Sequence, residues 1–388
     1  MGNIKFKINK MKLIPFLMLN GQYRLYDRLK SDFISSNIYD KILKSRETTY
    51  AVMNNKKYGI LNNEGDLIID CAYDLAGGFD KNGLALIKID QRYGFINMEN
   101  KLVIPAIHEY VSGFYDSLSS VKVNGKNKFM DTSGNFISQK EYEETSIFWG
   151  GRCSVKINGK WGLIDKNENI LIPPVYDSLN EENKVCRVEQ NGKYFLIDLN
   201  NNRISDYYDY MDYLSDGTYQ VSRKGFFGHI EENGNVLIPL EYENCTDFHG
   251  DYTGVYLDGK WFFIDRRNNI VIDRNKYNLH EILNGIEDGI AVVSNDDGCG
   301  LLDLNLDKMV TNFIYDQSWG IKGGLSSFLK NSKWGYVDKD GIERIDFKYS
   351  DPGYFEDGIA EVYSEGNMHE PGGIKFYIDY QGTEFREK

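Results

Sequence analysis

The sequence contains few of the residues on which disulfide frameworks and metal sites depend. Its 388 residues include only 5 Cys, 5 His and 7 Pro. The cysteines are odd in number, stand far apart and form no CxxC pair, which favours reduced thiols over a disulfide framework. No His lies at metal-ligand spacing from a Cys or another His. We therefore predict a cytoplasmic protein without a cofactor or metal, and the sequence leaves open secretion by a non-obvious route.

Basic runs and long apolar runs are also missing. The formal net charge is −13 and no run of basic residues is longer than two, so most of the surface would repel nucleic acid and anionic membranes. No stretch approaches the roughly 20 apolar residues that a membrane-spanning helix needs. The run from Leu13 to Leu19 resembles a short secretory signal. Because it also lines up with the first strand of a repeat, we interpret it as that strand. We expect neither a nucleic-acid nor a membrane partner.

Aromatic residues and glycine are abundant, and they recur in a pattern of about 35 residues. The 28 Tyr and 21 Phe favour strands, and the 38 Gly favour turns. Aligned on Trp161, the pattern places eleven anchors at Tyr23, Tyr58, Tyr93, Asn127, Trp161, Tyr194, Phe227, Trp261, Cys299, Trp334 and Lys375. Gly follows six anchors, Asp stands at the fifth place in eight units, and a Tyr recurs about fifteen residues after most anchors. Units this short cannot bury a core alone, so they must stack.

Each piece of the repeat has a physical interpretation. Asn158-Gly159, before the anchor Trp161, fits a two-residue hairpin turn in which both residues need a positive φ. Asp165 opens a second turn, where its carboxylate can accept backbone N–H groups. Pro173 suits the end of a third strand. The pattern therefore predicts units of three short antiparallel strands with an irregular return.

The predicted fold is an all-β single array over residues 1–388. Eleven units exceed the four to eight blades typical of a propeller, so we favour an open, curved or spiral array, with a β-propeller as the alternative. The longest step between anchors, from Trp334 to Lys375, contains residues 364–373, which are rich in Gly and polar residues. We interpret this segment as an inserted surface loop.

The repeat resembles a known family. Lys160-Trp161-Gly162-Leu163-Ile164-Asp165 and the equivalent segment at 333–338 are similar to the WG repeat, also called the KWG repeat, a family of bacterial tandem β-repeats. The resemblance covers the chain from about residue 13 to 385. It implies an all-β repeat fold and an interaction role, and it carries no shared ligand or catalytic residue. The units at Asn127, Tyr194, Trp261 and Lys375 depart from the pattern because they lack the Gly.

Several aromatic and acidic residues are not explained by the repeat. In the segment from 206 to 213, the repeat does not account for Asp206, Tyr207, Tyr210, Asp212 and Tyr213. Trp149 and Trp319 lie outside the anchor column, the set of equivalent anchor positions in the aligned units. Aromatic and acidic residues together suit a basic peptide or a sugar face, and Tyr is favoured at interfaces. The alternatives are an ordinary Tyr-rich strand edge and tryptophans packed under a return loop. These seven residues form our candidate binding surface.

The repetition itself favours a function. Repeat arrays offer extended surfaces to protein partners, so we expect a non-enzymatic binding or scaffold protein, with an immunity- or inhibitor-type partner as one form and a basic protein as a suitable ligand. The many aromatic residues leave a carbohydrate or cell-wall binding module as the alternative. A hydrolase with a site built from several repeats is a second alternative, although no GxSxG or phosphate-binding glycine motif supports it.

Overall fold

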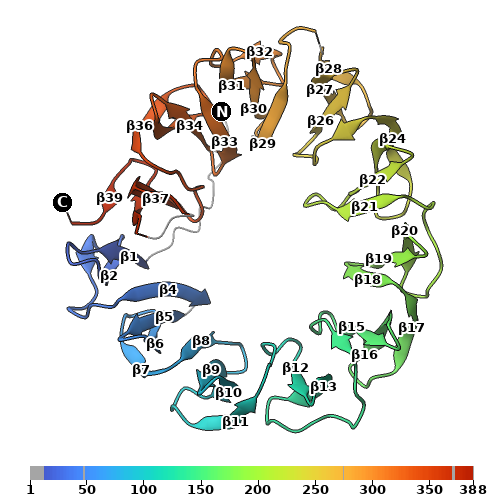
Figure 1. The fold of residues 1–388 in the computed structure, drawn as a ribbon. Helices are drawn as coiled ribbons and strands as arrows, with labels where there is room; N and C mark the ends of the chain where they lie inside the picture. The colour runs from blue at the N-terminus through green and yellow to red at the C-terminus, as the bar shows by residue number, and fades with distance from the viewer. Residues whose placement is uncertain (1–12, 47–48, 274, 369–371, 388) are drawn as a thin grey trace. The chain divides into compact units, whose positions relative to one another are not determined.

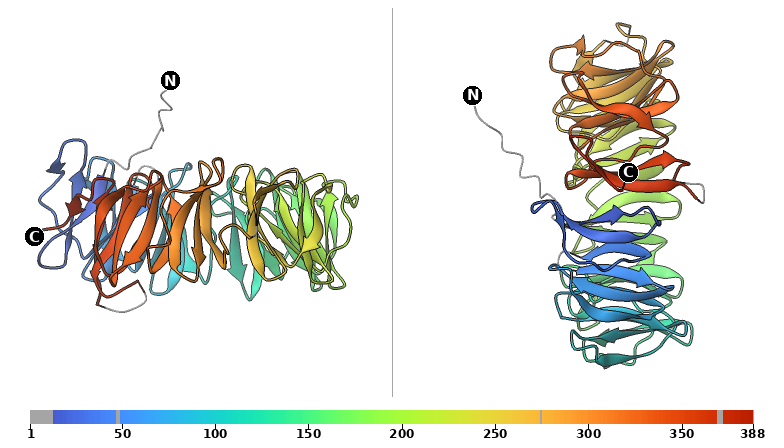
Figure 2. Two further views of the ribbon diagram at one scale, coloured as in Figure 1. Left: turned by 90° about the horizontal axis from the view of Figure 1, so that it is seen from above. Right: turned by 90° about the vertical axis from the view of Figure 1, so that its left-hand side faces the viewer.

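The structure, a computed structural model, describes residues 13–46, 49–273, 275–368 and 372–387. These residues are strands, turns and loops, and none of them forms a helix that could cross a membrane. The chain separates into two compact units. One is Leu17–Tyr207, and the other consists of the described residues of Met1–Phe16 and Tyr208–Lys388. Within each unit, small antiparallel sheets follow one another along the chain (Figures 1 and 2).

The 17–207 unit contains the first sheets of the array. After β1 (Leu13–Leu17), which crosses the division, its strands are β2 (Tyr23–Asp27), β3 (Asp32–Phe33), β4 (Lys41–Arg46), β5 (Thr49–Asn54), β6 (Lys57–Asn62), β7 (Leu67–Tyr73), β8 (Leu75–Phe79), β9 (Ala85–Ile89), β10 (Arg92–Ile96), β11 (Leu102–His108), β12 (Leu118–Val123), β13 (Lys126–Asp131), β14 (Glu144–Thr145), β15 (Arg152–Ile157), β16 (Lys160–Asp165), β17 (Ile170–Tyr176), β18 (Ser178–Glu182), β19 (Val185–Gln190) and β20 (Lys193–Asp198).

The 208–388 unit repeats the arrangement. Its strands are β21 (Tyr210–Tyr213), β22 (Tyr219–Arg223), β23 (Phe226–Ile230), β24 (Val236–Tyr242), β25 (Asn244–Cys245), β26 (Tyr252–Leu257), β27 (Lys260–Asp265), β28 (Ile270–Ile272), β29 (Glu281–Glu287), β30 (Ile290–Asn295), β31 (Gly298–Asp303), β32 (Lys308–Met309), β33 (Gln317–Lys322), β34 (Leu325–Lys330), β35 (Lys333–Asp338), β36 (Glu343–Tyr349), β37 (Ile359–Glu365), β38 (Ile374–Asp379) and β39 (Glu384–Phe385).

The predicted repeat agrees with the observed register. The described strands form eleven sheets, and every sheet contains one anchor at the first or second residue of a strand, as Trp161 in β16 and Trp334 in β35 show. The tandem array of small antiparallel sheets is thereby confirmed. Seven sheets have four strands, because part of the expected irregular return, such as β8, forms a further strand. Of the predicted loop 364–373, the first two residues lie in β37, and residues 369–371 lie outside the described residues.

The turns follow the predicted chemistry. Asn158 and Gly159 have φ values of 50° and 76°, as a two-residue hairpin turn of this kind requires. In the second turn, Oδ1 of Asp165 accepts the N–H groups of Asn167 at 2.9 Å and Asn169 at 2.8 Å. Residues that tolerate a positive φ thus form the first turn, and a short polar side chain fixes the second.

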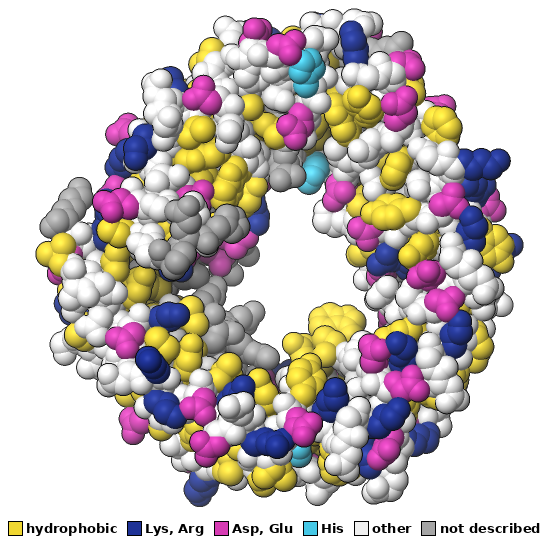
Figure 3. All heavy atoms as spheres, in the orientation of Figure 1, with side chains coloured by type: hydrophobic (Ala, Val, Ile, Leu, Met, Phe, Trp, Pro, Cys, Tyr) yellow, Lys and Arg dark blue, Asp and Glu magenta, His cyan; other side chains and the backbone are white. Residues whose placement is uncertain are grey.

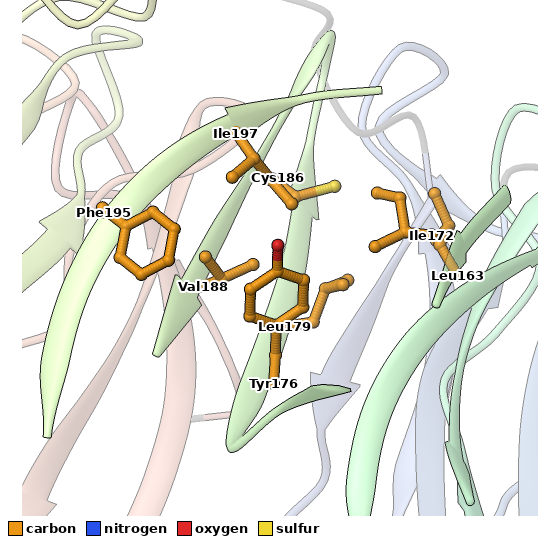
Figure 4. Close-up of a cluster of buried hydrophobic side chains, with 8 residues drawn as sticks. All are labelled: Leu163, Ile172, Tyr176, Leu179, Cys186, Val188, Phe195 and Ile197. Carbon is orange, nitrogen blue, oxygen red and sulfur yellow. The ribbon is translucent and has the colours of Figure 1, made fainter. Parts of the chain in front are cut away.

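A Tyr–Asp dipeptide joins each of several sheets to the next one along the chain. Tyr176 pairs with the anchor Trp161 in its own sheet, while its hydroxyl donates to Asn201 Oδ1 at 2.6 Å in the next sheet. The adjacent Asp177 accepts the N–H of Asn191 at 2.9 Å, in the hairpin turn of that sheet. Between the two sheets, Tyr176 lies in a cluster of buried apolar side chains drawn from both (Figure 4). Equivalent hydroxyl bonds join Tyr73 to Asn100, Tyr142 to Glu168 and Tyr242 to Asn268.

Removing one of these hydroxyl groups should weaken the contact between two neighbouring sheets, which we call a joint. We expect Tyr176→Phe to lower the free energy of unfolding by about 1 kcal/mol, because it deletes a hydrogen bond and leaves the ring in place. Asn201→Gly should cost a similar amount, since Asn201 has a φ of 65° that Gly tolerates. Urea unfolding and amide exchange of β20 would measure both. The double variant should be no less stable than either single variant, and fully additive losses would contradict the coupling.

His229 replaces an apolar residue of the repeat and lies in the core. It is fully buried on β23, where its edge faces Phe248 at a centroid distance of 4.9 Å. Nε2 lies 3.1 Å from the carbonyl oxygen of Thr246, to which it donates as the protonated nitrogen, and Nδ1 has no partner among the described residues. Burial lowers the pKa of His229 from 6.5 to about 4. The folded chain therefore holds this ring in the neutral form.

Acidification should destabilise the fold through this side chain. Because the pKa is lower in the folded state, the unfolded state binds the proton first as the pH falls below 6.5, and the loss continues down to about pH 4. The loss from this group is on the order of 3 kcal/mol. Urea unfolding at several pH values should show this slope in the wild type and a flatter one in His229→Leu. Equal slopes in the two proteins would refute this origin.

Candidate functional site

A cleft of about 370 Å³ lies between the β14–β17 sheet and the β18–β20 sheet. Its lining includes Trp149 from the loop before β15, the anchor Trp161 on β16, and Leu179 and Asn180 on β18. Leu179 also belongs to the core cluster of Figure 4, so the floor of the cleft is continuous with the core. Of the seven residues in the predicted binding surface, Trp149 alone lines this cleft.

Trp149 stands on a tight hairpin that fixes its backbone. Its N–H donates to the carbonyl oxygen of Arg152 at 2.8 Å, and the N–H of Arg152 donates back at 3.1 Å. Gly150 and Gly151, between them, have φ values of 56° and 82°, which glycine adopts without strain. The N–H of Gly151 also donates to Asp116 at 2.6 Å. The hairpin is therefore anchored to the preceding sheet, while Trp149 remains 71% exposed.

An ion pair forms one wall of the cleft. Nε of Arg152 donates to Oε1 of Glu181 at 2.6 Å, and both side chains are largely buried. Their charges cancel, so the cleft wall favours neither cations nor anions. Behind this wall lie the free thiols of Cys153 and Cys186, and burial raises the pKa of each to about 12. These thiols are therefore protonated and weakly nucleophilic.

A second cleft, of about 420 Å³, adjoins the first. Ser146 and Ile147 line both, and the second extends along Glu144 of β14 to Tyr110 and Lys122. Tyr110 is an exposed aromatic residue, like Trp149. We call the two clefts together the Trp149 groove. It crosses the joints between three successive sheets of the 17–207 unit.

The acidic tyrosine segment begins at the end of the 17–207 unit. Asp206 is exposed, and Tyr207 is half-exposed with its ring edge-on to Phe195 at a centroid distance of 5.0 Å. The guanidinium of Arg203 lies 4.2 Å from the centroid of the Tyr207 ring. Tyr207 is thus held between an aromatic and a cationic neighbour, and a partner can reach only part of its ring.

The other two tyrosines of this segment lie on β21 in the 208–388 unit. The ring of Tyr210 is exposed and lies 6.2 Å from that of Phe227, and the half-buried Tyr213 lies 5.2 Å from Tyr219. Because β21 forms an edge of its sheet, Tyr210 lies on an edge strand. This position is compatible both with a contact surface and with the ordinary Tyr-rich strand edge that the sequence allowed.

Carboxylates gather beside β21. Asp212 on this strand, Asp216 in the following turn and Asp247 after β25 lie close enough to interact. Burial raises the pKa of Asp247; Asp216 and Asp212 raise it further, and His249 opposes them. Asp216 is itself paired with Arg266 at 2.6 Å. Two neighbouring sheets therefore contribute one acidic cluster.

Trp319 lies on β33 and packs against aromatic neighbours. Its ring centroid is 5.9 Å from that of Trp334 and 6.0 Å from that of Tyr354, and its carbonyl oxygen accepts the Tyr354 hydroxyl at 2.5 Å. The side chain is half-buried. This is the packing role that the sequence offered as the alternative to stacking on a ligand.

Sequence reasoning missed most of the Trp149 groove. Arg152 and Glu181 are 29 residues apart, and Tyr110 and Asn180 stand outside the repeating columns. Their proximity depends on how neighbouring sheets pack, for which the sequence gives no pattern. The one signal was the off-column Trp149, followed directly by two glycines.

The fold and its columns define a tandem β-repeat protein. A profile described as "WG containing repeat" matches residues 58–93, 93–126, 129–161, 161–194, 227–261 and 334–367, which together cover more than half of the sequence. Five of the six segments begin at a predicted anchor. The chain therefore belongs to the WG repeat family, and the resemblance seen in the sequence is confirmed. No curated protein sequence matches the chain.

Solved structures resemble the chain only distantly. A eukaryotic initiation factor has a TM-score of 0.40 at 10% identity, over 77% of this chain and 95% of that one. Hsv2p of Kluyveromyces lactis has a TM-score of 0.33 at 11% identity, over 67% and 97%. PorZ, a surface component of the type-IX secretion system of Porphyromonas gingivalis, has a TM-score of 0.28 at 10% identity, over 89% and 51%. We draw no functional conclusion from similarities at this level.

Proposed function

We propose that the chain is a non-enzymatic binding or scaffold protein whose 208–388 unit docks a basic segment of a protein partner. The observation that carries this proposal is the distribution of charge. Residues 208–388 contain 17 Lys and Arg against 33 Asp and Glu, whereas residues 17–207 contain 24 against 25. On the face drawn in Figure 3, basic side chains stand among acidic ones over β4–β17, in line with this balance.

The repeat separates framework positions, which recur, from positions that differ between units. Anchors such as Trp334 and the Tyr–Asp dipeptides recur and pack within or between sheets, whereas Asp212 and Asp247 beside β21 belong to no recurring position. A surplus of one charge on one unit accelerates and orients association with an oppositely charged partner. Exposed Tyr210 at the edge of β21 adds an aromatic contact of the kind enriched at interfaces.

The acidic cluster offers a variant that separates binding from stability. Asp212→Asn with Asp247→Asn removes two interacting carboxylates, and burial already disfavours the charge on Asp247. We therefore expect this double variant to be at least as stable as the wild type and to bind a lysine-rich peptide three- to tenfold more weakly at low salt. Fluorescence anisotropy at 50 and 200 mM NaCl would measure the affinities, with weaker binding at the higher salt.

The matched control carries the same charge change in the other unit. Asp70→Asn with Glu99→Gln alters two exposed carboxylates of the 17–207 unit and should leave binding within about twofold of the wild type. A peptide of equal length in which Ser replaces Lys should not bind. Equal losses in the two double variants, or affinity that does not depend on salt, would refute docking on the 208–388 unit.

A further inference from the structure

The Trp149 groove has a chemistry unlike that of the acidic unit. Its two clefts, of about 370 and 420 Å³, each fall within the range of about 300–1,000 Å³ typical of small-ligand sites. Trp149 and Trp161 line the first cleft, and Tyr110 lines the second. The shared residues Ser146 and Ile147 connect them. A ligand that fills both must be elongated and must meet an aromatic surface in each half.

Neutral polar groups surround these aromatic residues. In the first cleft they include the hydroxyls of Ser154 and Ser178 and the amides of Asn180 and Asn183. Arg152 is paired with Glu181 in the first cleft, and the second cleft is lined by one cation, Lys122, and one anion, Glu144, which is paired with Lys156 at 2.6 Å. An apolar ligand would cover groups such as the Ser154 hydroxyl and the Asn180 amide, at a cost of about 1–3 kcal/mol for each group that it left without a hydrogen bond. Because the two clefts are lined by two cations and two anions in total, a charged ligand would find little compensating net charge.

One ligand class has the required combination. A sugar ring presents a face of C–H groups, which a flat indole or phenol ring can cover, and a rim of hydroxyls that donate and accept hydrogen bonds. Ser hydroxyls and Asn amides can serve both roles, which suits hydroxyl partners. Because the Trp149 hairpin is fixed by the backbone bonds between Trp149 and Arg152 and by the bond from Gly151 to Asp116, little backbone freedom would be lost on binding.

We propose that the Trp149 groove binds a neutral oligosaccharide, with one ring stacked on Trp149 and another on Tyr110. The proposal is independent of the basic partner assigned to the 208–388 unit, since it rests on other residues and on uncharged chemistry. The groove would allow one chain to hold a saccharide and a protein at separate sites.

The test uses the full chain on an array of neutral, anionic and amino-sugar glycans. We expect the wild type to bind at least one neutral oligosaccharide of three or more rings, and Trp149→Ala to lower that affinity tenfold or more. Tyr110→Ala should lower affinity for the trisaccharide and leave affinity for a disaccharide of the same series within twofold. Isothermal titration with the best array ligand would give the affinities.

The controls separate this result from unfolding and from the function proposed above. Trp149 is 71% exposed, so its replacement should not alter the unfolding midpoint. Phe136→Ala removes another exposed aromatic residue of the same unit that lines neither cleft and should bind normally. Asp212→Asn with Asp247→Asn should also leave glycan binding intact. A blank array, binding confined to anionic glycans, or equal binding by Trp149→Ala would overturn the proposal, whatever the basic peptide does.

Discussion

Successive narrow sheets are joined by a tyrosine at the end of the third strand and, in several units, by the carboxylate that follows it. Side chains of consecutive strand residues leave on opposite faces, so Tyr176 and Asp177 can reach two different turns of the following sheet. The acceptor for the tyrosine, Asn201, has a left-handed backbone, which restricts that place to a few residue types. Five other sheets have Gly at this place, Gly65, Gly134, Gly234, Gly341 and Gly382, each with positive φ. The backbone geometry is therefore the stricter requirement, and the hydrogen bond is an addition to it.

The glycine after the anchor explains where the third strand forms. A Cβ on Gly162 would lie 2.6 Å from the carbonyl oxygen of Ile172, so only glycine lets β17 approach this closely. Five of the six units with this glycine have a third strand of seven residues. Phe195, Phe262 and Phe376 take the place in other units, where the sheet ends at β20 or the third strand has two or three residues. Each Phe instead packs about 6.1 Å from a tyrosine of the preceding sheet.

The repeat made the local structure predictable from sequence, but not the groove. Turn residues such as Asp165 accept hydrogen bonds from neighbours two and four positions away. A turn that depends on such short-range bonds can be predicted from the sequence of one unit, and its recurrence in other units supports the prediction. The fourth strand was missed because segments such as β18 pair with the next hairpin without any fixed residue type. The groove was missed because it lies between sheets. Arg152 and Glu181 meet only once two sheets have packed, and no column marks either residue.

Because the residues that pack the sheets together differ from the residues that line the clefts, one fold can carry surfaces of different chemistry. The joints use backbone geometry and buried residues such as Tyr176, so the cleft positions beside them can change at little cost to the fold. Trp149 illustrates this freedom, since its hairpin occurs elsewhere as His249-Gly250-Asp251-Tyr252, with the same backbone pairing and a different side chain at its start. The same logic applies to charge. Lys57–Asp74 and Lys160–Asp177 pair within their units, whereas Phe226 stands where the lysine paired with Glu243 would be. When such a lysine is replaced, the neighbouring sheets still pack together, and the carboxylate no longer has that lysine as its partner. An acidic surface can therefore arise without a change of fold.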